Sequence, residues 1–242
     1  ALAAALPPAA SADPFAWITN QGSHDVSVID LASDQVVATI PVGRSPAGVV
    51  AVSRAGRVFV TNADSRNVSI IDMRTRAVVG TVPAGQGPVG IDASADGRLL
   101  MVADWHGNRL LPFAIEAGGA KPGAPIAVGK APAGVAVGAD ARRAWVAERD
   151  DNTIAEVDAA AGTVVARIDV GEHPFALLLD EAHARLYALN VLSDDVSVID
   201  LAQRRVIATV PVGKAPYGAA LAGGGRRLFV TNQHDESVSV ID

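Results

Sequence analysis

Short apolar runs recur along this chain of 242 residues, and each run is bounded by turn-forming residues. One unit shows the pattern clearly, with apolar runs at 47–53, 58–61, 68–71 and 78–82. Short runs rich in Val and Ile, bounded by Gly, Asn, Asp and Pro, are typical of β-strands. Helical periodicity is not sustained anywhere without a Gly or Pro, so the pattern predicts almost no helix.

The third run of each unit recurs nearly unchanged and sets a period. It reads Val-Ser-Val-Ile-Asp at 26–30, 196–200 and 238–242, and Val-Ser-Ile-Ile-Asp at 68–72. More divergent copies end at residues 114 and 158, so successive copies lie 42 or 44 residues apart. A period of roughly 40–50 residues is typical of β-propeller blades. We therefore expect an all-β propeller of four-stranded antiparallel blades, with six repeats visible.

Turn residues stand at fixed positions of the repeat. An Asp closes the third strand, where its carboxylate accepts backbone N–H groups two residues on. An Asn closes the second strand in four repeats, and we expect it there because Asn tolerates left-handed backbone geometry. A Gly ends the fourth strand, and a Pro then opens the next first strand, where no ladder N–H is needed. These prolines are Pro46, Pro88, Pro132, Pro174 and Pro216.

The second strand carries a recognisable signature. Residues 58–62 read Val-Phe-Val-Thr-Asn and residues 228–232 read Leu-Phe-Val-Thr-Asn. They resemble the Tyr-Val-Thr-Asn signature of the YVTN family of β-propeller repeats, as do the Val-Gly-x-x-Pro-x-Gly connector and the Val-Ser-Val-Ile-Asp strand. The resemblance covers residues 13–242, which we expect to form a single propeller domain. It implies a fold rather than one function, because members include surface-layer, periplasmic and dehydrogenase-associated proteins.

The two ends of the repeat array do not complement each other. Residues 15–40 supply second, third and fourth strands, whereas residues 216–242 supply first, second and third strands. Two pieces that share two strand types cannot form one blade, and natural sheets avoid an unpaired edge. We therefore expect a carboxyl-terminally truncated chain whose intact protein has seven blades. The alternative is a six-bladed ring with two incomplete blades.

Residues 1–12 are rich in Ala, Leu and Pro and differ from every repeat. Ala10-Ser11-Ala12 has the small-x-small form of a signal-peptidase site. We interpret this segment as a signal-peptide remnant, with a disordered leader as the alternative, and expect a periplasmic or otherwise exported bacterial protein. The segment is too short to span a bilayer, so we expect no membrane span.

Composition narrows the chemistry. The formal net charge of −6 argues against a nucleic-acid partner, which needs a basic surface. The chain has no cysteine, which excludes disulfides, Cys-based metal sites and thioether-linked haem. Asp92 is the one charged residue on the expected first strands, whereas a metal-dependent lactonase or a haem-bearing channel needs several inward ligands. We therefore expect no catalytic residue, no metal and no cofactor.

Polar and aromatic residues gather in two sets of loops, the connectors that lead into first strands and the loops that join second to third strands. Both sets should rise on the same face of the propeller. A polar face edged by aromatic rings suits another protein or a small anionic ligand as partner. The candidate binding residues are Arg44, Trp105, His106, Lys130, His173, Phe175, Lys214, Tyr217 and His234. For each of them the alternative is a solvated loop tip without a role.

These observations favour a non-catalytic periplasmic propeller that acts as a protein- or ligand-binding scaffold. The YVTN resemblance implies that some such propellers accompany quinone-cofactor alcohol or amine oxidation, so a periplasmic dehydrogenase is one expected partner. Two alternatives remain open at this point. One is a propeller enzyme of the lactonase or quinoprotein dehydrogenase type, and the other is a cell-surface repeat protein.

Overall fold

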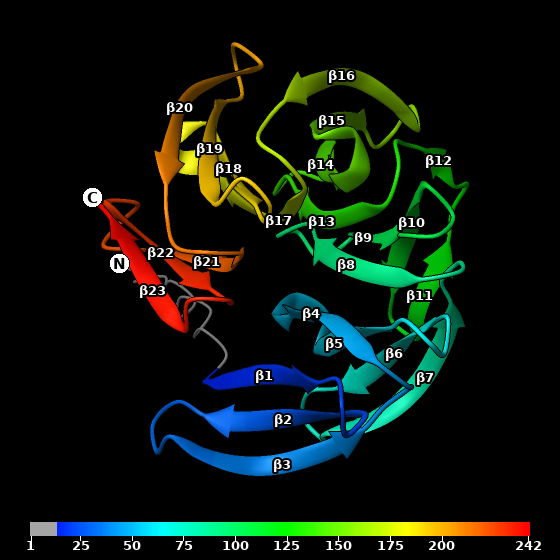
Figure 1. Cartoon of the computed structure of the whole chain (residues 1–242). Helices are drawn as coiled ribbons and strands as arrows, with labels where there is room; N and C mark the ends of the chain where they lie inside the picture. The colour runs from blue at the N-terminus through cyan, green and yellow to red at the C-terminus, as the bar shows by residue number, and fades with distance from the viewer. Residues whose placement is uncertain (1–13) are drawn as a thin grey trace, which may run out of the picture.

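The structure is a computed structural model that describes residues 14–242. Its strands form six antiparallel sheets that follow one another around a central axis (Figure 1). Within the described residues, helix is limited to three short 3-10 turns, η1 (Ser53–Ala55), η2 (Arg149–Asp151) and η3 (Glu181–His183). The all-β propeller that the repeat predicted is therefore confirmed. The segment that we interpreted as a signal-peptide remnant, residues 1–12, lies outside the described residues.

We number the blades 1 to 6 in chain order. Blades 2, 4 and 5 each hold four antiparallel strands in sequence order, from an inner strand at the axis to an outer strand at the rim (Figure 1). The strands of blade 2 are β4 (Pro46–Val52), β5 (Arg57–Asn62), β6 (Asn67–Asp72) and β7 (Ala77–Pro83). Those of blade 4 are β13 (Pro132–Val137), β14 (Arg143–Glu148), β15 (Thr153–Asp158) and β16 (Thr163–Asp169). Those of blade 5 are β17 (Pro174–Asp180), β18 (Arg185–Asn190), β19 (Asp195–Asp200) and β20 (Arg205–Pro211).

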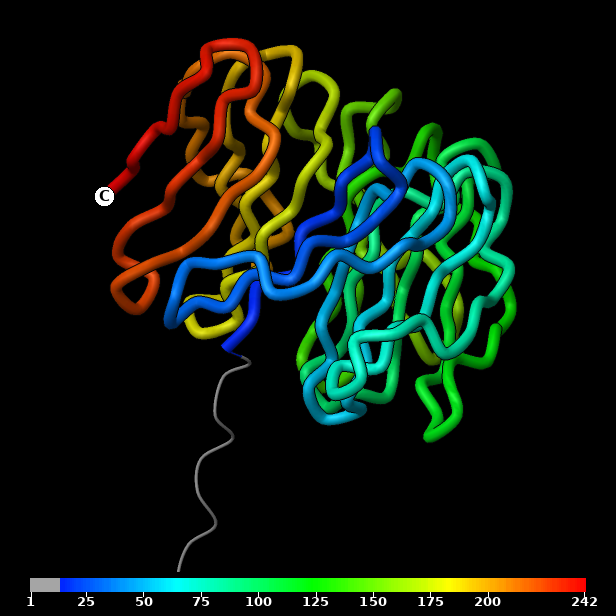
Figure 2. Tube along the Cα trace, turned by 90° about the horizontal axis from the view of Figure 1, so that it is seen from below, coloured from blue at the N-terminus to red at the C-terminus, as the bar shows by residue number. Residues whose placement is uncertain are grey.

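Blades 1, 3 and 6 depart from this pattern. Blade 1 contains β1 (Phe15–Asn20), β2 (Asp25–Asp30) and β3 (Gln35–Pro41), and blade 6 contains β21 (Pro216–Ala222), β22 (Arg227–Asn232) and β23 (Ser237–Ile241). Blade 3 contains β8 (Pro88–Ala93), β9 (Leu99–Asp104), β10 (Arg109–Glu116), β11 (Gly119–Pro122) and β12 (Ile126–Ala127). Its fourth strand is split in two because the segment 123–125 ends in a proline, which cannot donate to the ladder. Figure 2, turned by 90°, shows that Asp242 lies at the outer margin of blade 6.

The turn after the third strand forms as the sequence predicted. The Asp72 carboxylate accepts the backbone N–H groups of Arg74 at 3.1 Å and Thr75 at 2.8 Å. The bond from the Thr75 N–H is the main cause that holds the pKa of Asp72 below its ordinary value. Equivalent bonds form at Asp30, Asp158 and Asp200. The opening prolines also start the inner strands, as expected.

Our reason for the Asn at the end of the second strand was wrong. In blade 2 the left-handed residue of this loop is Arg66, with φ 57°, and Asn62 lies within strand β5. The Asn62 side chain is fully buried, and its Nδ2 donates to Asn67 at 2.8 Å and Ser69 at 2.9 Å. A Cβ on Gly43 would lie 2.7 Å from the Asn62 Cβ, so the connector glycine is there for close packing. Asn62 therefore bonds to β6 of its own blade and packs against the connector from the preceding blade.

The core lies between the blades. One cluster joins Trp17, Val26 and Val28 of blade 1 to Val58 and Val60 of blade 2, and the last four of these residues are fully buried. Similar clusters fill each later junction between consecutive blades. Each blade therefore depends on its neighbours for burial, as in other repeat proteins.

The inner strands approach one another closely around the axis. A Cβ on Gly90 would lie far inside van der Waals contact with the Ala133 carbonyl oxygen of the next blade. The Thr61 hydroxyl adds a polar bridge, because it accepts the Gly48 N–H of its own blade at 2.8 Å and donates to the Val89 carbonyl of the next blade at 2.7 Å. Glycine and threonine at these positions thus set the distance between blades.

The facing sides of blades 1 and 6 are less buried than the other blade faces. Val238 and Val240 of β23 are 56% and 55% exposed, whereas their counterparts in blade 2, Val68 and Ile70, are 0% and 3% exposed. On blade 1, Ile18 is 46% exposed. A seventh blade between these two faces stays a prediction, and it would cover this apolar surface.

Replacing Thr61 by valine keeps the side-chain shape but removes both polar contacts. The Gly48 N–H and the Val89 carbonyl would lose their bonds to the hydroxyl, so we expect a loss of about 1–2 kcal/mol in the free energy of unfolding. The control is Thr231→Val, since Thr231 is exposed and bonds only to Gly218 of its own blade. Urea unfolding of the two variants should show the larger loss for Thr61→Val. Equal losses would contradict a bridge between blades.

The glycine contact provides a second test. Gly90→Ala should destabilise the fold by roughly 3 kcal/mol, at the upper end of the range for an overpacked site, because the added methyl meets backbone rather than a movable side chain. Gly22→Ala is the matched control, since a Cβ there has no atom within 4 Å. Thermal unfolding measures both variants. If Gly90→Ala unfolds at the wild-type temperature, the inner strands are not in this contact.

Candidate functional site

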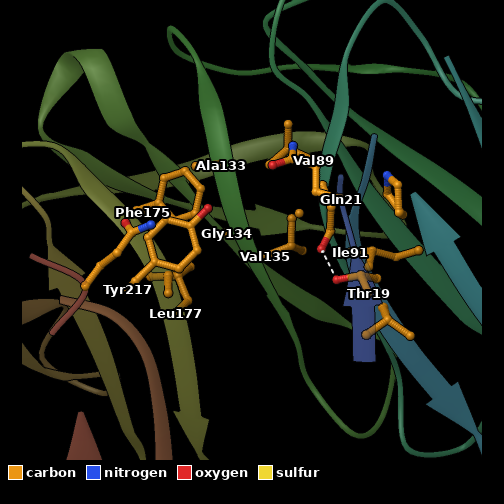
Figure 3. A pocket seen from close by; sticks show the side chains of 17 residues that line it. Thr19, Gln21, Val89, Ile91, Ala133, Gly134, Val135, Phe175, Leu177 and Tyr217 are labelled. Atoms are coloured by element: carbon orange, nitrogen blue, oxygen red, sulfur yellow. Dashed lines mark hydrogen bonds between the residues drawn. The ribbon is translucent and has the colours of Figure 1, made fainter. Parts of the chain in front are cut away.

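The connectors and the loops between second and third strands rise on one face, which we call the top face. Around its centre, the residue after each opening proline lines a recess of about 420 Å³ on the axis, the axial recess (Figure 3). These residues are Ala47, Val89, Ala133, Phe175 and Tyr217. The lining also includes Gly48, Gly90 and Gly134, so backbone forms much of the wall, and no lining residue carries a charge.

Three aromatic side chains from different blades meet beside this recess, and two of them, Phe175 and Tyr217, line it. Phe175 and Tyr217 are stacked, with ring centroids 4.5 Å apart and an angle of 26° between the ring planes. Trp105, in the loop after β9, lies 6.1 Å from Phe175 at a tilt of 55°. We call these three residues the aromatic cluster. Figure 3 shows Phe175 and Tyr217 on one side of the recess and Gln21 across from them.

A second recess of about 510 Å³, the side recess, adjoins the aromatic cluster. It shares Phe175 and Tyr217 with the axial recess and adds Arg44, Arg66 and His106. Its acidic lining residue is Asp64, which accepts the Ser45 hydroxyl at 2.6 Å. The structure therefore places basic and aromatic groups side by side on the top face.

A positive charge, that of Arg149, lies beside the aromatic cluster. Arg149 is not among the candidate residues that the sequence suggested. Its guanidinium carbon lies 5.5 Å from the centroid of the Trp105 ring, and the group also pairs with Asp150. Burial raises the pKa of the Tyr217 hydroxyl above its ordinary value, and a protonated phenol can donate a hydrogen bond.

The repeat alignment could have identified Arg149 as a candidate, but not Arg66. The residue directly after each second strand lines one of the two recesses in blades 1, 2, 3 and 6, and Arg149 is the blade 4 residue at this position. The residues at this position are Gln21, Ala63, Trp105, Arg149, Val191 and Gln233. Aligning this position across the repeats identifies Arg149 as the counterpart of Trp105. Arg66 was missed because it stands three residues further along its loop, where the blades have little in common.

Of the nine predicted residues, five come together and four do not. Arg44, Trp105, His106, Phe175 and Tyr217 line the side recess. The other four lie in top-face loops but line neither recess, and they are Lys130, His173, Lys214 and His234.

Lys130, His173, Lys214 and His234 make their contacts within the top-face loops themselves. The Lys130 ammonium lies 3.4 Å from an Asp151 carboxylate oxygen. His173 has φ 53° and occupies a left-handed position that Ala131 and Ala215 fill in other blades, so the site does not require an imidazole. The backbone N–H of His234 donates to the Lys214 carbonyl at 3.2 Å.

A third recess, of about 470 Å³, opens at the far end of the axis and contains Asp92 and Glu181. Asp92 accepts the Val137 backbone N–H at 2.7 Å and so joins blade 3 to blade 4. Burial is the largest influence on this carboxyl and raises its pKa from 3.8 to about 6, although hydrogen bonds from Val137 and Ala93 oppose the rise.

Residues 14–242 contain neither a cluster of metal-ligating side chains nor a helix that could span a membrane. No group of three or more His, Cys, Asp or Glu side chains in this part of the chain is arranged to hold a metal ion. No helix among the same residues is long and apolar enough to cross a membrane.

Comparison with protein families identifies a similar group. The family described as YNCE-like beta-propeller matches residues 51–143, from the inner strand of blade 2 to the start of β14 in blade 4. The search of curated proteins found no match to this chain. The match supports the propeller fold, and the narrower resemblance to YVTN repeats stays a prediction.

Solved structures agree on the fold. A functionally unknown protein from Desulfotomaculum acetoxidans aligns with a TM-score of 0.80 and 13% identity, over 95% of this chain and 79% of that one. A candidate 6-phosphogluconolactonase from Bacteroides uniformis aligns with a TM-score of 0.78 and 13% identity, over 93% and 76%. Hydrazine synthase of Kuenenia stuttgartiensis aligns with a TM-score of 0.67 and 17% identity, over 94% and 92%. At these identities the likeness concerns the fold alone.

Asp92 predicts a specific pH dependence. Because its pKa is raised in the folded state, the folded protein binds this proton more tightly than the unfolded chain, and the associated stability is present below about pH 4. That stability is lost as the pH rises through 6, by roughly 2–3 kcal/mol for a shift of this size. The Asp92→Asn variant should lack this pH-dependent contribution to the free energy of unfolding. Urea unfolding of both proteins at pH 4.5 and 7.5 measures it, and parallel pH profiles would contradict it.

Proposed function

We propose that this β-propeller is a non-catalytic, exported binding protein whose top face holds a partner, either another protein or a small anionic ligand. The observation that carries the proposal is the convergence of Trp105, Phe175 and Tyr217, from three blades, at the side recess. Aromatic side chains that remain accessible at the centre of a surface are the commonest anchors of binding sites.

The recesses are lined by apolar, amide and guanidinium groups, which are common in ligand-binding sites. The axial recess offers backbone, small apolar side chains and the amides of Gln21 and Gln233. The side recess adds guanidinium groups next to the aromatic cluster. Volumes of this size fall within the usual range for ligand sites, in which a few polar groups orient a mostly apolar body.

The charge distribution supports an anionic partner. The chain as a whole has a formal net charge of −6, yet Arg44, Arg66 and Arg149 gather around the aromatic cluster. Lys130 and Lys214 lie in loops of the same face without lining either recess, and they suit the polar rim of a protein interface. Such a basic region on an acidic protein would steer an acidic partner toward the recesses.

A periplasmic dehydrogenase with a quinone cofactor is the protein partner that we propose. This part of the proposal comes from the YVTN resemblance, together with the signal-peptidase-like sequence at 10–12. In that role the propeller is an accessory that contacts the enzyme through its top face.

A lactonase is the alternative with a specific observation in its favour, because one structural neighbour is described as a candidate 6-phosphogluconolactonase. The likeness at 13% identity concerns the fold. Hydrolysis of 6-phosphogluconolactone by the purified protein would favour this alternative and contradict a purely binding role.

Affinity capture tests the binding role. The wild-type protein, a Trp105→Ala/Tyr217→Ala variant and a Leu31→Ala variant are immobilised and exposed to periplasmic extract of the source organism. Leu31 is 57% exposed and follows β2 on the opposite face, which makes it a matched control. We expect a dehydrogenase subunit on the wild-type protein and the control, and a loss of about tenfold or more on the aromatic variant.

Circular dichroism would first establish that all three proteins are folded. Equal capture by the aromatic variant would contradict the top-face site. If the aromatic variant and the wild type capture the same proteins in equal amounts, those proteins bind to another surface.

A further inference from the structure

The aromatic cluster leaves one flat surface free. One face of Phe175 is covered by Tyr217, whereas Tyr217 is 46% exposed and borders both recesses. Figure 3 shows the Tyr217 ring beside the open part of the axial recess. A planar ring laid on Tyr217 would extend the existing stack of two rings, in the offset geometry that aromatic groups prefer.

The same cluster is poorly suited to a cationic ligand. The guanidinium of Arg149 already lies 5.5 Å from the centroid of the Trp105 ring, so a cation of the protein itself occupies that π face. Arg44 and Arg66 line the adjoining recess. Against these stand Asp64 in the recess and Asp150, which pairs with Arg149. The local balance is positive, and a positive ligand would be repelled.

Arg44 and Arg66 are available to an anion. Both are exposed, and neither guanidinium forms an ion pair with another residue of 14–242. The contact of Arg44 is made by its backbone N–H, which donates to the Ser65 hydroxyl at 2.7 Å. A guanidinium group presents paired N–H donors that match the two oxygens of a carboxylate.

The two recesses border the same side chains, an arrangement that suits a molecule with two parts. Both are lined by Gln21, Ala47, Val89, Phe175 and Tyr217, so a ring on Tyr217 borders the side recess as well as the axial one. We infer that the site binds a small planar aromatic carboxylate, with its ring stacked on Tyr217 and its carboxylate paired with Arg44 and Arg66. This inference rests on the proposed binding function and adds the chemical class of the ligand.

The test uses two probes with the same ring and different charge. Naphthalene-2-carboxylate and naphthalene-2-methanol are titrated into the protein by isothermal titration calorimetry. We expect the carboxylate to bind at least about tenfold more tightly than the alcohol. Only the carboxylate should weaken at high salt, because added ions screen charged pairs on an exposed surface.

Variants locate the two parts of the site. Arg44→Gln/Arg66→Gln should lower the affinity for the carboxylate about tenfold, to that of the alcohol, and leave the alcohol unchanged. Tyr217→Ala should weaken both probes by about tenfold, as expected for a lost stacking surface. The matched control is Arg74→Gln/Arg142→Gln, which removes the same charge from exposed arginines in turns of the opposite face.

The outcomes separate the two proposals. Equal affinities for both probes, lost together in Tyr217→Ala, would overturn the ligand class and leave the top face as a binding site. Carboxylate binding that survives in Arg44→Gln/Arg66→Gln, or no binding of either probe at millimolar concentration, would also overturn the inference. The proposed function is judged by partner capture, which fails independently if the aromatic variant captures as much as wild type.

Discussion

The close approach of neighbouring inner strands is the constraint on which the rest of the structure depends. Gly90 has no room for a side chain because the Ala133 carbonyl of the next blade lies against it, and Gly134 meets the Phe175 carbonyl in the same way. Thr61 bridges two blades at their shared junction with its single hydroxyl. The radius of the axis, and with it the size of the axial recess, follows from these backbone contacts. Bulky inner-strand residues would push the blades apart and open the clusters between them.

The residue after each opening proline can vary because it lies above these contacts, at the mouth of the axial recess. Ala47, Val89 and Ala133 are small, whereas Phe175 and Tyr217 are large. The mouth is therefore open over blades 2 to 4 and walled by rings over blades 5 and 6. A repeat that is nearly uniform in its backbone thus acquires an asymmetric site through changes at one position. Loops and mouths of rigid scaffolds commonly carry function for this reason.

The polar residue at the end of the second strand shows a second kind of variation. Asn62, Asn190 and Asn232 bond to serines of their own blades, and their Oδ1 atoms have no hydrogen-bond partner in the structure. Blades 3 and 4 have Asp104 and Glu148 instead, both fully buried. Asp104 accepts the connector N–H groups of Gln86 and Gly87, and Glu148 accepts that of Gly129. Asp104 also pairs with Arg109 at 2.7 Å and Glu148 with Arg167 at 2.9 Å. The carboxylate and the arginine must change together, because a buried charge without its partner is strongly destabilising.

The sequence by itself determined the propeller, the strand order of each blade, the Asp turns and the two three-stranded ends, because these depend on periodicity and on short-range chemistry that every repeat carries. It also placed Trp105, Phe175 and Tyr217 on the top face. Only the tertiary structure decided that these three rings meet, that Arg149 covers Trp105, and that Lys130, His173, Lys214 and His234 stand apart. It also replaced our reason for Asn62, whose side chain bonds to Asn67 and Ser69 and packs against a connector glycine instead of forming a left-handed turn. The physical reason is that contacts across the axis join residues of different repeats, and their distances depend on how closely the inner strands pack.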